Sequence, residues 1–270
     1  MFSTHTAKLI ALKDAKRTMR TPGIYLAYMF ACGIIALYAW FFSSLKDSSG
    51  ISISGAFPGA SLLTAVGIYS LYMAVSSVSA VARERQDKTL EVLFYGPVNE
   101  SSFIAGKYAG RMIPYLILAV ATLIYITLIS LALNSGAGAD MITLSIFSLL
   151  LISCVVSLGI MLSTLTGSVT GAIFILMAFM LGLFVLKVLG FILSMLPAFN
   201  PMLTLAKDIV ATLLNITQYI SPVEYLGIGL DAAGSNDPWK YLLAFLYPAA
   251  YTCVMLLLSA VILKKKGVRR

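Results

Sequence analysis

The sequence predicts an all-α polytopic membrane protein with six transmembrane helices. Of its 270 residues, 60% are hydrophobic and only 11% are charged, whereas a soluble domain carries about 25% charged residues. This composition excludes a soluble globular fold and also a disordered chain. Six apolar runs are each long enough to cross a hydrocarbon core, which takes about 20 residues in a helix. These expected spans are 22–44, 59–82, 112–133, 141–165, 169–195 and 241–263.

The basic residues predict which side of the membrane each connection faces. Of the 19 Lys and Arg, five precede the first span, five lie in segment 83–111 and five follow the last span. Cytoplasmic connections carry such a bias, and an even number of helices separates the three groups. We therefore expect a multi-pass protein of the cytoplasmic (inner) membrane with both termini, including the tail 264–270, in the cytoplasm. The basic surplus suits a lipid bilayer with anionic lipids and is no evidence for a nucleic-acid partner.

Residues 1–21 are expected to form an amphipathic helix that lies on the membrane surface. On a helical wheel the apolar residues form one arc and the basic residues another, as in interfacial helices. The apolar arc contains Ala11, Leu12, Ala15 and Met19, and the basic arc contains Lys13, Lys16, Arg17 and Arg20. A merely basic topology signal would have a similar sequence, and both interpretations stay open at this point.

Segment 83–111, between the second and third spans, is expected to form two short cytoplasmic helices that meet at an elbow. Residues 82–94 have apolar side chains on one helical side, at Leu90, Leu93 and Phe94. Gly96-Pro97 breaks this helix, and Asn99 can cap the next one. A passive connection needs only a handful of residues, so a segment of this length indicates a docking surface.

Segment 196–240 is expected on the outer side, between the fifth and sixth spans. Leu203–Ile220 has the pattern of an amphipathic helix, and its polar residues argue against a seventh span. We therefore expect a shallow or re-entrant helix over the mouth of the bundle, followed by an irregular or partly helical stretch from Pro222 to Pro238. Lys187, the one charge inside a span, is expected to extend its ammonium group to the outer interface rather than to act in an ion relay.

The sequence contains neither a complete phosphate-binding loop for ATP nor a complete set of residues for nucleophilic catalysis. The nearest match to a GxxxxGK(S/T) phosphate loop, Gly106-Lys107-Tyr108, lacks the hydroxyl residue and the upstream glycine. The single histidine, His5, cannot complete a Ser/His/Asp set. We expect no metal, no cofactor and no enzymatic activity in this chain. The spans contain no Asp, Glu or His, which argues against ion-coupled transport, so energy would have to enter from a partner.

Segment Ala82–Val98, followed by Gly106-Lys107, resembles the loop after the second helix of ABC-2-type transporter permeases. That family shows an acidic helix end, then Gly-(Ser/Thr)-(Leu/Ile)-Glu, a (Ser/Thr)-Pro-(Val/Ile) elbow and a Gly-Lys pair. The matching residues are Glu84, Thr89, Leu90, Glu91, Leu93, Pro97, Val98, Gly106 and Lys107. Lys88 stands where glycine is usual, and Gly96 where Ser or Thr is usual. The amphipathic N-terminus and Ser221–Tyr225 also resemble the family, so the resemblance covers essentially the whole chain.

The resemblance implies the permease subunit of an ATP-driven ABC exporter. Two copies, or this chain and a homologous one, would form the translocation pathway, each on a separate ATPase subunit that binds ATP and Mg. The first helix of segment 83–111 would be the coupling helix, and residues 1–21 the interface helix. Implied ATPase-coupling residues are Glu84, Lys88, Glu91, Leu93, Phe94, Pro97 and Lys107. The interface helix would contribute Leu12, Lys13, Lys16, Arg17, Met19 and Arg20, and the pathway lining Tyr69, Tyr72 and Thr170.

Two other functions stay open on the sequence. One is a membrane scaffold that transmits ATPase-driven motion to an envelope partner without transport. The other is an ATP-independent channel or carrier, which the uncharged spans disfavour. Binding of an ATPase would separate the first two functions from the third, and substrate movement into vesicles would separate the exporter from the scaffold.

Overall fold

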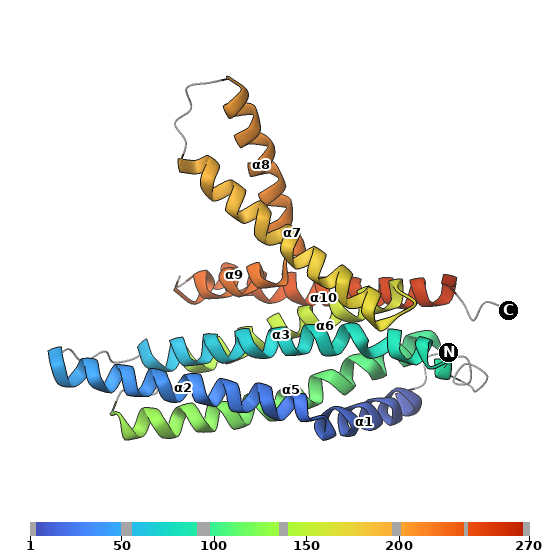
Figure 1. Cartoon of the computed structure of the whole chain (residues 1–270), viewed down its shortest axis with the longest axis horizontal. Coiled ribbons are helices and arrows are strands. Elements are labelled where there is room, and N and C mark those ends of the chain that lie inside the picture. The colour runs from blue at the N-terminus through green and yellow to red at the C-terminus, as the bar shows by residue number, and fades with distance from the viewer. Residues whose placement is uncertain are drawn as a thin grey trace.

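The chain forms a bundle of α-helices, with no strand among the residues that the structure describes (Figure 1). The computed structural model describes residues 4–49, 56–90, 98–134, 140–195, 201–234 and 237–266. The helices are α1 (Thr4–Arg20), α2 (Pro22–Ser49), α3 (Ala56–Gln86), α5 (Glu100–Ala132), α6 (Asp140–Leu165), α7 (Val169–Met195), α8 (Pro201–Ile220), α9 (Pro222–Gly234) and α10 (Pro238–Lys266). The predicted all-α polytopic fold is confirmed.

Six of these helices are long and apolar enough to cross a membrane, and each overlaps one of the six apolar runs in the sequence. The candidate spans are Pro22–Leu45, Phe57–Gln86, Glu100–Ala132, Met141–Leu165, Val169–Met195 and Pro238–Lys265. The two spans that border segment 83–111 extend into it, because α3 continues to Gln86 and α5 already begins at Glu100. Much of segment 83–111 therefore consists of rigid extensions of two membrane helices.

The centre of the bundle is the pair α3 and α6. In the apolar window of α6, 72% of the residues are buried, compared with 11% in α7. Small residues allow the two central helices to approach closely, as is usual between membrane helices. A Cβ atom on Gly159 of α6 would lie only 2.0 Å from the hydroxyl oxygen of Ser77 on α3. One turn further on, the Ser163 hydroxyl accepts hydrogen bonds from the Val81 and Ala82 amides, at 3.0 and 2.8 Å.

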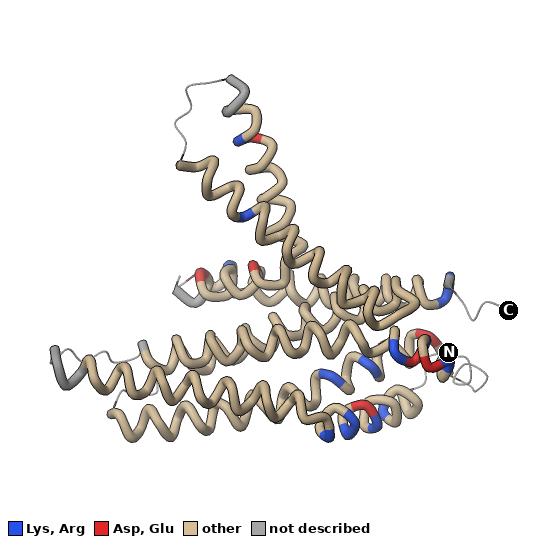
Figure 2. Tube along the Cα trace, viewed as in Figure 1, with Lys and Arg blue, Asp and Glu red and all other residues tan. Residues whose placement is uncertain are grey.

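Both ends of the described chain lie at the same end of the bundle (Figure 1). Helix α1, the last turns of α10 and the facing ends of α3 and α5 meet there, and most of the Lys and Arg residues gather on these elements (Figure 2). A chain that crosses a membrane an even number of times has both its ends on the same side. The shared end is the one that the basic bias assigns to the cytoplasm.

Helix α1 packs on α5, and its expected position on the membrane surface stays a prediction. Its buried residues are Ala11, Asp14, Ala15 and Thr18. The expected apolar arc is therefore buried only in part, because Leu12 points outward and is 53% exposed. Two polar residues take part in the packing instead, and both have partners inside the protein.

The outer segment is helical along almost its whole described length. Helices α7 and α8 form an arm that leans away from the bundle (Figure 1), and a Cβ on Gly190 of α7 would lie 2.5 Å from Leu214 of α8. The helix expected over Leu203–Ile220 is confirmed as α8. The stretch after Pro222, expected to be irregular or partly helical, is helix α9, because proline at the first helical position fixes a helical φ without losing a needed donor.

Two tyrosines secure the turn between α8 and α9. The Tyr225 hydroxyl donates to the carbonyl of Tyr219 at 2.7 Å, and the Tyr251 hydroxyl of α10 donates to the carbonyl of Ile220 at 3.1 Å. Both bonds satisfy carbonyl groups that a helix end leaves without partners. Lys187 of α7, expected to extend to the outer interface, forms an ion pair with Glu224 of α9 while its side chain stays 51% exposed.

Candidate functional site

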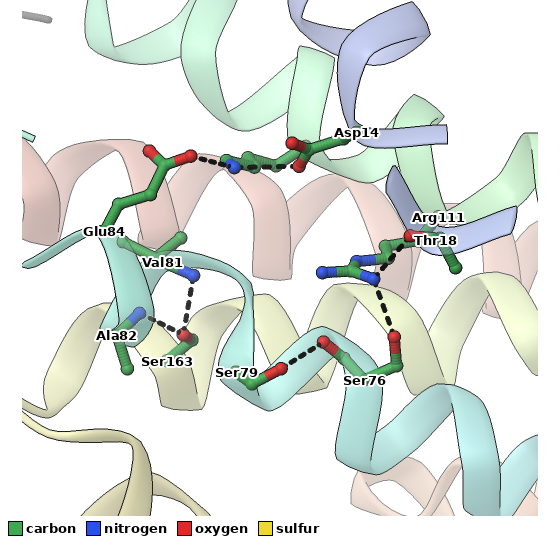
Figure 3. A network of polar contacts seen from close by, with 10 residues as sticks. Asp14, Thr18, Ser76, Ser79, Val81, Ala82, Glu84, Arg111 and Ser163 are labelled. Atoms are coloured by element: carbon green, nitrogen blue, oxygen red, sulfur yellow. Dashed lines mark hydrogen bonds and ion pairs between the residues drawn. The ribbon is translucent and has the colours of Figure 1, made fainter. Parts of the chain in front are cut away.

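Three charged residues meet where the two helical stems of segment 83–111 pass α1, and we call them the stem cluster. Lys107 of α5 is 2% exposed, and its ammonium nitrogen lies 2.8 Å from a carboxylate oxygen of Asp14 on α1. The same nitrogen forms a second ion pair with Glu84 of α3 (Figure 3). One buried cation thus holds together the end of the second span, the start of the third and the N-terminal helix.

Two glycines explain why α1 and α5 come close enough for this contact. A Cβ on Gly106 would lie 2.8 Å from the Cβ of Ile10 and 2.9 Å from the carbonyl oxygen of Ala7. A Cβ on Gly110 would lie 2.7 Å from the Cβ of Asp14. Glycines four residues apart share one helix face and let two backbones touch. The close approach brings the short Asp14 side chain within reach of Lys107.

The electrostatics of the stem cluster favour a fixed geometry. Removing charges from water costs several kcal/mol per ion, and only close pairing offsets this cost. Here one ammonium serves two carboxylates, and one oxygen of Glu84 is buried without a hydrogen-bond partner. The ring centroid of Phe103 lies 5.4 Å from the Lys107 nitrogen and adds a cation–π contact. Separating any member would leave a buried charge unpaired.

One helical turn deeper, Arg111 of α5 repeats the connection with neutral partners. Its guanidinium donates to the hydroxyls of Thr18 on α1 and Ser76 on α3, both at 2.7 Å (Figure 3). Lys107 and Arg111 therefore bind the same two neighbouring helices at successive turns. The three elements move as one body unless these contacts break.

The end of α3 is also tied to the turn between α6 and α7. Arg85 donates to the carbonyls of Thr164 and Thr166, at 3.3 and 2.9 Å, and the Gln86 side-chain oxygen accepts from the Val169 amide at 3.3 Å. Glu84 and Arg85, neighbours in sequence, thus bind different parts of the bundle. A displacement of this helix end would reach α1 and α5 on one side and the α6–α7 turn on the other.

Lys88 ends α3 in a left-handed backbone conformation, with a φ of 56°. Its amide donates to the carbonyl of Arg85 at 3.2 Å, which closes the last turn. Glycine adopts this conformation without steric cost, whereas a residue with a Cβ does not. The geometry gives a physical reason for the glycine that is usual at this position in the permeases that the segment resembles. The Lys88 side chain is exposed.

The other expected ATPase-coupling residues lie outside the part of the chain that the structure describes. They are Glu91, Leu93, Phe94 and Pro97. On the interface helix, Lys13, Lys16, Arg17 and Arg20 are exposed, and Met19 is half-buried. These placements leave the expected roles as predictions.

The three expected pathway residues do not meet in one cavity. Tyr69 is 2% exposed, shares a hydrogen bond of 2.6 Å with the Thr122 hydroxyl, and borders a small cavity between α3, α5 and α6. Tyr72 borders a different cavity beside α1, and Thr170 is exposed at the start of α7. Their role in a pathway stays a prediction.

The sequence-based expectations missed Asp14 and Arg111. Asp14 is the one acidic residue in segment 1–21, among five basic ones, and an isolated carboxylate of this kind suits a buried cation elsewhere in the chain. The pair Gly106 and Gly110 was the second signal, because it marks a helix face made for close packing. Neither signal identifies the partner helix, so the contact between α1 and α5 is known only from the structure.

The family model described as ABC-2 family transporter protein matches residues 6–268. The chain belongs to the ABC-2 transporter family. It is therefore a multi-pass membrane permease, the membrane subunit and not the ATP-binding part of an ABC transporter, and the family associates with ABC ATPase partners. No curated protein matches the chain.

Proposed function

We propose that this ABC-2 permease is half of the membrane pathway of an ATP-driven exporter. Two permease chains, identical or homologous, would form the pathway in the cytoplasmic membrane with their termini in the cytoplasm. Each would receive a separate ATPase subunit, which binds ATP and Mg, at the loop between α3 and α5. The observation that carries the proposal is the stem cluster, because it connects both ends of that loop to the rest of the bundle.

The stem cluster suits a mechanical connection. Glu84 precedes the loop and Lys107 follows it, so their ion pair makes the two stems move together. Asp14 extends the connection to α1, and Arg85 extends it to the α6–α7 turn. Movement of a bound ATPase would thereby displace spans on both sides of the centre at once. If the two stems were not joined, the same movement of the ATPase would displace the loop and leave the spans in place.

The coupling residues divide into two groups in this proposal. Glu84, 17% exposed, and Lys107 position the stems from inside the chain. Lys88, Glu91, Leu93 and Phe94 contact the ATPase, and Pro97 sets the elbow. The basic face of α1 with Lys13, Lys16, Arg17 and Arg20, together with Leu12 and Met19, acts at the interface with ATPase and lipid. Tyr69, Tyr72 and Thr170 are proposed to face the substrate pathway as the two permeases rearrange.

Charge reversal in the loop tests the proposal. The full chain is purified in mild detergent with its co-purifying ATPase, reconstituted in proteoliposomes, and assayed for ATP hydrolysis and substrate movement. We expect Glu91→Lys to lower the substrate moved per ATP hydrolysed by about tenfold, the equivalent of one lost contact of about 1.4 kcal/mol. Asp87→Lys is the matched control, because Asp87 is exposed in the same loop but outside the family pattern.

The outcomes separate the three functions left open by the sequence. The exporter is supported if the wild type shows coupled transport, Glu91→Lys impairs it and Asp87→Lys leaves it intact. ATP hydrolysis that depends on the permease without movement of any substrate supports the scaffold. Absence of a co-purifying ATPase, together with transport that needs no ATP, contradicts the proposal and supports a channel or carrier.

A further inference from the structure

A cavity of about 320 Å³ lies between α1, the first turn of α2 and the second half of α3, next to the stem cluster. Three arginines from three different helices line it: Arg17, Arg83 and Arg111. Its wall also carries hydroxyl groups, among them those of Thr18 and Ser76, which accept hydrogen bonds from Arg111. A cavity of this size, with several donors pointing into one space, has the form of a small-ligand site.

The positive charges around this cavity are not balanced by the protein. Lys107 borders the cavity but is paired with Asp14 and Glu84. Arg17 and Arg83 form no ion pair with any residue in the described part of the chain, and the Nε atom of Arg111 is buried without a hydrogen-bond partner. The charges of Arg17 and Arg83 repel the Arg111 guanidinium, and Asp14 is the one carboxylate that attracts it.

Such an excess of like charge calls for an anion. Repulsion between charges a few Å apart is strong where the surroundings are partly apolar, and a bound anion converts it into attraction. Guanidinium groups match the oxygens of a phosphate group particularly well, because their donors form a planar fork. The cavity therefore has the charge and the donor groups that a phosphate requires.

The start of α2 adds to the positive potential. Pro22 and Gly23 line the cavity, and they are the first residues of a helix that is 28 residues long. Unpaired amides and the helix dipole make such a terminus attractive for anions. Gly23 has no side chain to cover its backbone, and an added Cβ would lie 3.2 Å from the Tyr72 ring.

The rim of the cavity is apolar and accessible. Val75 lines the cavity and is 48% exposed, and Leu26 and Leu71, on the adjoining turns of α2 and α3, are 65% and 62% exposed. A phosphate held by the arginines could therefore carry acyl chains that lie along these two spans. Basic pockets between membrane helices on the cytoplasmic side bind lipid head groups in this way.

We propose that Arg17, Arg83 and Arg111 form a binding site for the phosphate group of an anionic ligand, with a phospholipid of the adjoining leaflet as its source. This inference does not depend on the proposed function. The site binds the ligand between α1 and the first two spans, so its occupancy stabilises the contact of the N-terminal helix with the bundle.

Native mass spectrometry of the full chain in detergent tests the site. The probes are dioleoyl-phosphatidylglycerol, dioleoylglycerol as a lipid without phosphate, and inorganic phosphate. Arg17→Gln/Arg83→Gln removes two of the three guanidiniums but leaves the hydrogen-bonded Arg111 in place. Each arginine near the surface contributes about fivefold to the affinity, so we expect phosphatidylglycerol to bind this variant about thirtyfold more weakly.

The matched control is Lys264→Gln/Lys265→Gln. It removes the same charge from exposed positions of α10 that do not line the cavity, and we expect affinity for phosphatidylglycerol within about threefold of wild type. Equal loss in both variants would overturn the proposal, because it would show general surface attraction. The proposal would also be overturned if neither phosphatidylglycerol nor inorganic phosphate bound in a way that depends on the arginines. Arginine-dependent binding of inorganic phosphate but not of the lipid would retain the phosphate site and assign it to a soluble source.

Discussion

Two lysines of this permease form ion pairs with glutamates, and their surroundings differ completely. Lys107, in the stem cluster, is 2% exposed and pairs with residues from two other helices. Lys187, on the α7–α8 arm, is 51% exposed and pairs with one glutamate of α9. A buried ion pair holds its geometry because separation is costly, whereas an exposed one exchanges its partner for water. The difference fits the role proposed for the stem region in transmitting motion, and it means that the ion pair on the arm fixes its position less firmly.

Packing also differs between the region of the stem cluster and the α7–α8 arm. Around the stem cluster, glycines bring backbones into contact, and α3 and α6 bury most of their surface. Along α7, by contrast, large apolar side chains such as Phe174, Leu181 and Phe184 are more than 60% exposed. In a membrane these side chains face lipid or a second permease chain, and neither requires a unique arrangement.

The largest expected effect comes from removing the buried cation. Lys107→Met leaves Asp14 and Glu84 buried without a counter-charge, and we expect the free energy of unfolding to fall by about 3–5 kcal/mol. Denaturant unfolding in detergent, followed by circular dichroism, measures this loss. Adding Asp14→Asn and Glu84→Gln to the variant should restore much of the stability. Failure of this rescue, with the fold intact, would show that Lys107 acts through packing and not through charge.

The next effect distinguishes glycines in contact from glycines in open space. Gly110→Ala places a Cβ 2.7 Å from the Cβ of Asp14, and such overpacking costs about 1–3 kcal/mol. Gly182→Ala on α7 meets nothing within 4 Å, so the better helix propensity of alanine should stabilise by up to about 1 kcal/mol. Thermal unfolding of both variants should shift the midpoint in opposite directions. A shift of the same sign would contradict the assignment of α7 to the loosely packed region.

A smaller gain is expected where α3 ends. Lys88→Gly relieves a left-handed backbone and should stabilise the end of α3 by about 1 kcal/mol. Hydrogen exchange of the amides around residues 84–88 detects this local change. Asp87→Gly is the control, because Asp87 does not have a positive φ, and it should protect these amides less than wild type does.

The smallest effect is expected at the exposed pair. A double-mutant cycle with Lys187→Met and Glu224→Gln should give a coupling of about 0.2–1 kcal/mol. The coupling should also fall with added salt, because exposed charges are screened. A coupling as large as that expected at Lys107 would remove the contrast between the two regions and would make the arm a rigid element.

The helical extensions could be predicted from the sequence only in part. The helix start after Asn99 was visible as a local signal, and α5 does begin at Glu100, whereas the elbow expected at Gly96-Pro97 lies outside the described residues. Residues 82–86 were expected to begin a separate short helix, whereas in the structure they continue α3. Nothing local marks the end of a membrane span inside a continuous helix, because the same backbone hydrogen bonds run through both parts.

The sequence by itself determined the six spans and the all-helical fold, and its basic residues predict which end faces the cytoplasm. The hydrocarbon core of a bilayer accepts only apolar segments whose backbone hydrogen bonds are all formed within the protein. The local composition of the sequence shows where such segments lie. Only the tertiary structure decided that Asp14 meets Lys107, that Lys187 meets Glu224, and that Arg17, Arg83 and Arg111 surround one cavity. These contacts join residues far apart in the chain, and they depend on which helix faces touch, which no local pattern specifies.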